Sequence, residues 1–241
     1  MSSSISFREW EPIYNTILAD LGFGRAADER ARDVAVDLAA PFDHQQLDRL
    51  DGATVTIVGA APSLSAELDA FAPASADAIV AASTAVDVLA DHDIEVDLMV
   101  TDLDKNTNTA CKLTRSGTPV AAHAHGDNIS LLREWLPRFD AEATLVTTQA
   151  APQGPVENFG GFTDGDRAAF IAHGFGAAEL RFLGWNFDDP SVDPLKARKL
   201  QWAEQLLYWL ERRRGDRFDV LDGRRGSLAD DPSTVSTDST K

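Results

Sequence analysis

Six short, mostly apolar segments recur along the chain from Thr54 onward, and stretches with helical spacing of apolar residues separate most of them. Each has the length of a strand that is buried on both faces of a sheet. The expected strands are 54–59, 78–83, 98–104, 120–126, 144–149 and 181–187. The expected helices lie near 64–71, 84–91, 107–116, 128–139 and 164–173. This alternation predicts an α/β fold: a Rossmann-like, three-layer structure with a parallel sheet between two layers of helices.

Helical segments flank this region on both sides. Large apolar residues recur at helical spacing between Phe7 and Leu18, and a second apolar face runs over 28–40. A final amphipathic helix is expected from Leu195 to Arg214. We therefore expect an N-terminal helical region over 1–50 and an α/β domain with its C-terminal helix over 51–215. The segment 222–241 is rich in Ser, Thr and Asp, which predicts a disordered acidic tail.

The net charge of −17 arises from 39 acidic and 22 basic side chains. Such a chain repels phosphate backbones, so nucleic acid is not an expected partner. Because 44% of the residues are hydrophobic, we interpret the acidity as adaptation of a folded protein to molar salt, as in a halophilic archaeon, where charges are screened. The alternative is a merely acidic cytoplasmic enzyme.

The sequence predicts a cytoplasmic protein. No apolar run approaches the ~18 residues of a membrane span, and the first residues do not resemble a signal peptide. The single cysteine, Cys111, fits a reducing compartment. We expect no membrane partner, and the sequence leaves an oligomer possible.

Polar side chains end the third and fourth expected strands. Asp102 and Asp104 follow the third strand, and His123, His125 and Asp127 lie at the end of the fourth. Side chains two residues apart in an extended chain share a face. If these strands are neighbours in a parallel sheet, the five groups meet at the edge where such sheets bind ligands. The crowded carboxylates predict a magnesium site at Asp102, Asp104 and Asp127; the alternative is a pair of solvated loops with helix-capping acids.

Two glycine-containing loops are further candidates. Gly59 to Ser63 follows the first strand, where small residues allow close approach to a phosphate, although a structural tight turn is equally compatible. In the segment that ends at Arg167, Asn-Phe-Gly-Gly-Phe-Thr-Asp-Gly-Asp-Arg, the arginine can bind phosphate while Asp164 or Asp166 holds a polar heterocycle. The alternative there is a capped helix N-terminus with favourably placed carboxylates. The chain has neither the glycine fingerprint of dinucleotide-binding folds nor a P-loop.

The end of the fifth strand, Thr147-Thr148-Gln149, is either a polar strand terminus or a substrate contact. Taken in order, Gly-x-x-Pro-Ser-Leu after the first strand, Thr-Asp-Leu-Asp, His-Ala-His-Gly-Asp-Asn, Thr-Thr-Gln and the ten-residue glycine segment resemble the archaeal 6-hydroxymethyl-7,8-dihydropterin pyrophosphokinases, the MptE-like family. The resemblance covers the chain from the N-terminal helices to about Phe187. It departs at Lys105 and Ala61, where the family often has glycine.

The resemblance implies that 51–215 is a catalytic domain that transfers diphosphate from ATP to 6-hydroxymethyl-7,8-dihydropterin, with magnesium, giving AMP and the pterin diphosphate. The product would serve folate or methanopterin biosynthesis. The family is similar in fold to thiamine pyrophosphokinases, whose acidic motif after the third strand corresponds to Asp102 and Asp104. By that analogy Ser83 and Thr84 lie near the nucleotide and Asp127 lies near the metal.

Diphosphoryl transfer requires an aligned alcohol and neutralised phosphate charge rather than a covalent intermediate. Candidate roles follow by chemical type. His125 or Asp127 accepts the alcohol proton, and Arg167 stabilises phosphate charge. The nucleotide is assigned to Gly59, Ser63, Ser83 and Thr84, and the pterin to Thr148, Gln149, Asp164 and Asp166.

Two alternatives from other classes remain. The pattern His123-x-His125-x-Asp127 matches the first part of a zinc-hydrolase motif, although Asn128 stands where that motif has its final histidine. A nucleotide-binding module without catalytic activity is the second alternative.

Overall fold

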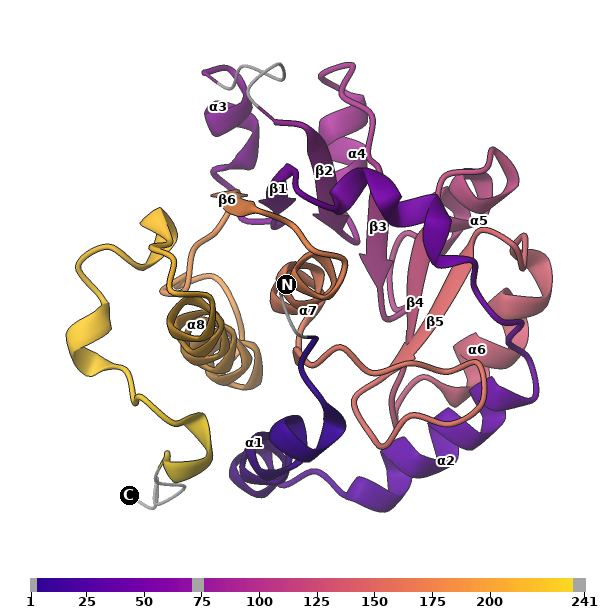
Figure 1. Cartoon of the computed structure of the whole chain (residues 1–241), viewed down its shortest axis with the longest axis horizontal. Helices are drawn as coiled ribbons and strands as arrows, with labels where there is room; N and C mark the ends of the chain where they lie inside the picture. Colours follow the sequence, from indigo (N-terminus) through magenta and orange to yellow (C-terminus); the bar gives the residue numbers. More distant parts are fainter. Residues whose placement is uncertain (1–3, 71–75, 236–241) are drawn as a thin grey trace.

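The computed structural model describes residues 4–70 and 76–235. It contains a six-stranded sheet with helices on both faces (Figure 1). The strands are β1 (Thr54–Val58), β2 (Ala78–Ala82), β3 (Leu98–Thr101), β4 (Val120–Ala124), β5 (Thr144–Thr148) and β6 (Glu179–Leu183). Their order is β5-β4-β3-β2-β1-β6, and all neighbours are parallel. The predicted parallel α/β fold is confirmed.

Successive strands from β1 to β5 are added in one direction, and β6 returns to the free side of β1. The helices are α1 (Phe7–Leu21), α2 (Arg25–Val36), α3 (Leu64–Leu68), α4 (Ala85–Ala90), α5 (Thr107–Arg115), α6 (Ile129–Trp135), α7 (Asp164–Gly174) and α8 (Pro194–Arg214). Short 3-10 helices are η1 (His44–Leu50), η3 (Leu136–Arg138), η4 (Asp219–Leu221), η5 (Arg225–Ser227) and η6 (Pro232–Thr234).

The sheet separates two apolar clusters, because adjacent strand residues point to opposite faces. Val80 of β2 belongs to the cluster that contains Phe170 of α7 and Leu206 of α8. Its neighbour Ala81 belongs to the cluster that contains Leu89 of α4 and Leu132 of α6. Burial on both faces explains why a central strand such as β2 is apolar at consecutive positions, whereas the edge strand β6 alternates, with Glu179 and Arg181 exposed.

Helices α1 and α2 lie beyond the carboxyl ends of β3, β4 and β5 (Figure 1). The buried Trp10 of α1 donates a hydrogen bond from its indole nitrogen to the backbone oxygen of Gln149, after β5, at 2.9 Å. The start of α2 packs on the loop after β4: a Cβ placed on Gly126 would lie 2.4 Å from Cβ of Ala27. The N-terminal helices therefore border the sheet edge at which polar residues were predicted to gather.

Some predicted boundaries are wrong. The sixth strand is Glu179–Leu183 rather than 181–187, because its pairing with β1 stops at Leu183 and the left-handed Gly184 (φ 68°) follows. The second helix begins at Arg25 and ends at Val36 rather than covering 28–40. Across residues 4–70 and 76–235, no helix combines the length and apolar character that crossing a bilayer requires.

The predicted disordered tail is wrong for 222–235. Arg225 forms an ion pair with Glu211 of α8 at 2.6 Å, and Arg224 forms one with Glu204 of the same helix. Leu228 and Val235 pack against the apolar cluster of α7 and α8. These contacts order a polar segment whose composition by itself favours disorder, while 236–241 lies outside the described residues.

Candidate active site

The polar ends of β3 and β4 lie side by side. The two strands pair in parallel as far as Thr101 and Ala122, so Asp102 and His125 emerge at the same edge. Oδ2 of Asp102 lies 3.6 Å from Nε2 of His125. The backbone N–H of Asp104 donates to Oδ1 of Asp102 at 3.2 Å. The structure therefore brings together Asp102, Asp104 and His125.

Asn128 joins these two strand ends. Its amide nitrogen donates to the backbone oxygens of Asp102 (2.6 Å) and His123 (2.7 Å), and its Oδ1 accepts from the backbone N–H of His125 at 3.1 Å. Every hydrogen-bonding group of this buried amide is thus used. Between the strands and α5, Leu103 has a left-handed backbone (φ 68°). Such strained residues gather at functional sites.

The acidic groups perturb one another. Burial and the adjacent Asp102 raise the pKa of Asp104 to about 6. For Asp102, burial opposes ionisation, but hydrogen bonding to His125 and Asp104 outweighs it and lowers the pKa. Burial, followed by the charges of Asp102 and Asp104, raises the pKa of Asp164 well above its usual range. Asp164 therefore lies near the acidic end of β3, an arrangement that favours a bound cation.

The start of α7 supplies the cationic group of the site. Nη1 of Arg167 lies 2.9 Å from Oδ1 of Asp164, and its Nη2 donates to the backbone oxygen of Phe162 at 2.8 Å. Nε of Arg167 is buried and has no hydrogen-bond partner among the residues that the structure describes. Gly161 packs so closely that a Cβ there would lie 2.5 Å from Cα of Arg167. The paired glycines thus allow the loop to fold back on the first turn of α7.

Asp166, predicted to contact the pterin, makes structural contacts in this loop, and its pterin contact stays a prediction. It is fully buried, and its carboxylate accepts from the backbone N–H groups of Phe162 (2.6 Å) and Thr163 (2.9 Å) and from the Thr163 hydroxyl. With Thr163 as N-cap, this is a capping box. The capped-helix interpretation, left open by the sequence, describes Asp166 correctly.

A pocket with an empty volume of about 550 Å³ opens at this edge. Its lining combines acidic, basic, imidazole, amide and aromatic groups from six parts of the fold: Phe23, Gly24, Ala27, Asp28, Asp102, His125, Gly126, Asp127, Gln149, Phe162, Arg167 and Lys199. Three of the predicted catalytic residues, His125, Asp127 and Arg167, therefore share one pocket with Asp102 and Gln149.

Other predicted residues lie elsewhere along the edge. Gly59 and Ser63 follow β1, and Ser83 and Thr84 follow β2; at about 5 Å per strand, β1 is roughly 10 Å from β3. The Asn106 amide links this region to the acidic loop by donating to the backbone oxygen of Ser83 at 3.2 Å. An ATP molecule is long enough to extend over both parts, so the predicted nucleotide contacts stay a prediction.

Thr148 and His123 are buried in the sheet. Oγ1 of Thr148 accepts from the backbone N–H of Ala150 at 3.1 Å, which explains it as part of a polar strand terminus. Nδ1 of His123 is 3.0 Å from Oγ1 of Thr147, and burial lowers the pKa of His123 well below its usual range. Among the described residues, no group of three or more His, Cys, Asp or Glu side chains is arranged to hold a metal ion.

The sequence interpretation missed two pocket residues from outside the sheet, Asp28 of α2 and Lys199 of α8. A signal for Asp28 was present: it shares the buried stripe of α2 with Ala31 and Ala35, at positions i, i+3 and i+7. An acid on an apolar stripe requires buried donors. Lys199 carries no comparable local signal, because a partly exposed lysine is ordinary on an amphipathic helix.

Together the fold and the pocket define a parallel α/β protein with a carboxylate-rich ligand site at the carboxyl edge of its sheet. Comparison with known protein families identifies the family to which the chain belongs. The family described as 6-hydroxymethylpterin diphosphokinase MptE-like matches residues 33–191, and the chain belongs to this family.

Curated relatives agree over nearly their whole length. The chain is 34% identical over 220 residues to the 6-hydroxymethyl-7,8-dihydropterin pyrophosphokinase of Methanothermobacter thermautotrophicus, covering 84% of this chain and 94% of the relative. It is 32% identical over 226 residues to the protein of the same name from Pyrococcus furiosus, with 86% and 95% covered. The protein of that name from Methanocaldococcus jannaschii is 28% identical over 232 residues, with 86% and 96% covered.

Proposed function

We propose that this chain transfers diphosphate from ATP to 6-hydroxymethyl-7,8-dihydropterin in a magnesium-dependent reaction, with AMP as the second product. Family membership supports the reaction. The observation that carries the proposal at the level of residues is the pocket itself, which is lined by Asp102, by the cationic Arg167 and Lys199, and by His125 and Gln149. Acidic and cationic groups in one pocket fit a triphosphate and its metal ion.

Asp102 and Asp104 are the residues that would hold magnesium. Their crowding with Asp164, expressed in the raised pKa values of Asp104 and Asp164, fits a site that a cation completes. Magnesium is commonly held by one or two carboxylates together with substrate phosphates, so a preformed three-ligand cage is not required. When bound, the ion would neutralise charge on the β- and γ-phosphates. The exposed Asp127, predicted as a third ligand, lines the same pocket.

The protein's own groups are suited to align the reaction. Arg167, held by Asp164 and by the backbone oxygen of Phe162, has a buried Nε to offer a phosphate oxygen. The substrate hydroxyl attacks the β-phosphorus, the bond from the β-phosphorus to the oxygen of the α-phosphate breaks, and AMP leaves with that oxygen.

Asp127 is the better candidate to accept the hydroxyl proton. Nε2 of His125 faces Asp102, and Nδ1 of His125 lies 3.5 Å from the backbone nitrogen of Asp127. Both imidazole nitrogens therefore have neighbours, whereas the carboxylate of Asp127 is exposed to the pocket. In this arrangement His125 positions the loop, and the proton passes to Asp127.

The experiment is product analysis with reduced 6-hydroxymethylpterin, ATP and magnesium. We expect AMP and pterin diphosphate in equal amounts, separated by chromatography and identified by phosphorus NMR. ADP with a pterin monophosphate would contradict attack at the β-phosphorus. Free phosphate without a pterin product would favour the hydrolase, and nucleotide binding without turnover would favour the non-catalytic module. Asp127→Asn tests the proposed proton acceptor. Its control is Asp91→Asn, the same substitution at an exposed position after α4.

We also propose that the protein functions in the cytoplasm of a cell with high internal salt. The net charge of −17 and the single cysteine support this setting. Its salt dependence is a separate measurement from its reaction, and the two proposals stand or fall independently.

A further inference from the structure

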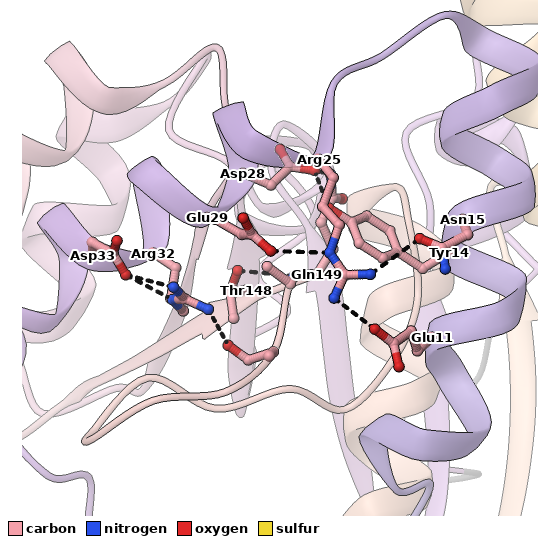
Figure 2. A network of polar contacts seen from close by, with 12 residues as sticks. Glu11, Tyr14, Asn15, Arg25, Asp28, Glu29, Arg32, Asp33, Thr148 and Gln149 are labelled. Carbon is pink, nitrogen blue, oxygen red and sulfur yellow. Dashed lines mark hydrogen bonds and ion pairs between the residues drawn. The ribbon is translucent and has the colours of Figure 1, made fainter.

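The reaction as described leaves one buried carboxylate in the pocket wall without a role. Asp28 of α2 is 5% exposed, and three donors surround it. Its Oδ2 accepts from the Tyr14 hydroxyl and from Nε2 of Gln149, both at 2.7 Å, and its Oδ1 accepts from the backbone N–H of Gly126 at 2.7 Å. Figure 2 shows Asp28 directed toward Tyr14 and Gln149 in the space between α1, α2 and the end of β5.

The nearby arginine does not neutralise Asp28. Arg25 instead pairs with Glu11 at 2.6 Å and with Glu29 at 3.0 Å, and donates to Asn15 of α1 at 3.3 Å (Figure 2). Within the described part of the chain, the donors that hold Asp28 are therefore all neutral. Burying a carboxylate costs free energy even when three donors bind it, so stability alone does not explain Asp28. Buried polar networks of this kind fix the orientation of the side chains that take part in them.

Two of the three donors of Asp28 belong to the pocket. Gly126 and Gln149 line it, as does Asp28 itself. Because a carboxylate only accepts hydrogen bonds, it dictates how the Gln149 amide is turned: Nε2 must face Asp28, and Oε1 must face away from it. Without this contact the two ends of the amide have nearly the same shape, and either orientation would fit.

We propose that Asp28 is a positioning residue that sets the ring selectivity of the pocket. By holding Nε2 of Gln149, it leaves Oε1 as the end of this pocket-lining amide that can accept a hydrogen bond, from the ligand as well as from the neighbouring His123. The acceptor fits a heterocycle with an amino group at this position and disfavours one with a carbonyl there. This inference rests on the proposed function, since it concerns which pteridine the same site accepts.

Asp28→Asn provides the sharpest test. The new Oδ1 still accepts from the Gly126 N–H, but Nδ2 now stands where Oδ2 was. Tyr14 can accept from Nδ2 through its hydroxyl oxygen, whereas Gln149 can accept only by turning its Oε1 toward residue 28. Nε2 of Gln149 then faces the ligand, so the variant should favour a ring carbonyl over a ring amino group.

The affinity of each protein for two ligands is measured by quenching of ligand fluorescence. The ligands are 6-hydroxymethylpterin and 6-hydroxymethyllumazine, which has a carbonyl in place of the 2-amino group. Wild type should prefer the pterin by about tenfold, the ratio expected from one hydrogen bond. Asp28→Asn should lose or reverse this preference while its affinity for magnesium–ATP stays within about twofold, which a general loss of structure would not allow.

Two matched controls separate positioning from stability. Asp33→Asn makes the same substitution on the exposed side of α2, where Asp33 pairs only with Arg32 among the described residues, and it should leave the preference unchanged. Tyr14→Phe removes one donor of Asp28 but keeps the carboxylate, so it should lower stability and retain the preference. In a Gln149→Ala background, Asp28→Asn should not change the preference further.

If Asp28→Asn does not fold, Asp28→Ser replaces it, because a hydroxyl accepts or donates and should bring the preference close to one. A folded Asp28 variant with the wild-type preference overturns the inference, as does an equal loss of affinity for both pteridines and for ATP. Wild type that binds both pteridines equally removes Gln149 from pterin recognition, which is a failure of the site assignment. No pteridine binding at all is a failure of the proposed function.

Discussion

Replacing Asp166 with alanine tests whether this residue caps α7 or binds substrate. The substitution removes a fully buried acceptor of three hydrogen bonds. Two backbone N–H groups, of Phe162 and Thr163, lose their partner, at about 1 kcal/mol or more each. Loss of an N-cap interaction contributes about 1 kcal/mol. Burial raises the pKa of Asp166, which means that burying its carboxylate is itself unfavourable for stability. Removing the carboxylate therefore offsets part of the lost hydrogen-bond energy, and the free energy of unfolding should fall by about 2–4 kcal/mol.

The assay is urea unfolding followed by tryptophan fluorescence, with Asp193→Ala as the control. Asp193 caps α8 through one hydrogen bond, to the backbone N–H of Lys196 at 2.9 Å, at an exposed site. Its removal should cost only about 1 kcal/mol. The free energies of unfolding are compared at equal m-values, since a change in m would signal altered compactness.

One result would refute the reasoning. If Asp166→Ala unfolds at the wild-type urea concentration and its KM for the pterin rises by about tenfold or more, a shift of about 1.4 kcal/mol in binding, then Asp166 contacts substrate and the capping box is not its function. A large loss of stability with the pterin KM close to wild type supports the structural role.

Three further outcomes are expected. Asp102→Asn should remain folded and lose about 10²–10³ in kcat, the usual effect of removing a preorganised electrostatic partner; near-normal turnover at saturating magnesium would exclude Asp102 from the metal site. Lys199→Gln should raise the KM for ATP several-fold, at about 1 kcal/mol for a partly exposed charge contact, with the pterin KM unchanged; an effect on the pterin alone would place Lys199 on the other substrate. The melting temperature should rise between ~0.1 M and ~2 M potassium chloride as the Debye length falls from about 10 Å to about 2 Å, and a constant melting temperature would contradict the interpretation of the net charge of −17.

The parallel sheet was predictable because its signals are local. Most strands are apolar over their own length, and the amphipathic helices repeat their apolar residues within their own turns. The acidic edge followed from the same pattern, since Asp102 and His125 end neighbouring strands. The order of 222–235 was not predictable in this way: it depends on ion pairs such as that of Arg225 with Glu211, whose partner lies on α8, outside the segment itself.

The roles of individual carboxylates were also beyond the sequence. Asp164 and Asp166 lie two residues apart on one helical turn, and by composition either fits a ligand contact or a cap. Only the fold of the preceding loop, with Gly161 packed on Arg167, directs Asp166 to the backbone and Asp164 to the arginine. Asp28 was missed because its partners come from three other segments of the chain.

In the proposed function, phosphate binding and ring selection depend on residues from different parts of the chain. The family match over residues 33–191 contains the acidic edge and Arg167, the groups suited to a triphosphate. Asp28 and Lys199 lie outside that range, on helices packed against the edge. The alignments with the curated relatives cover more of this chain, 84–86% of it, so they extend beyond 33–191. In the proposed function, phosphate contacts thus come from the sheet edge, Arg167 and Lys199, whereas the orientation of Gln149, and with it the proposed choice of ring, depends on a helix that precedes the sheet.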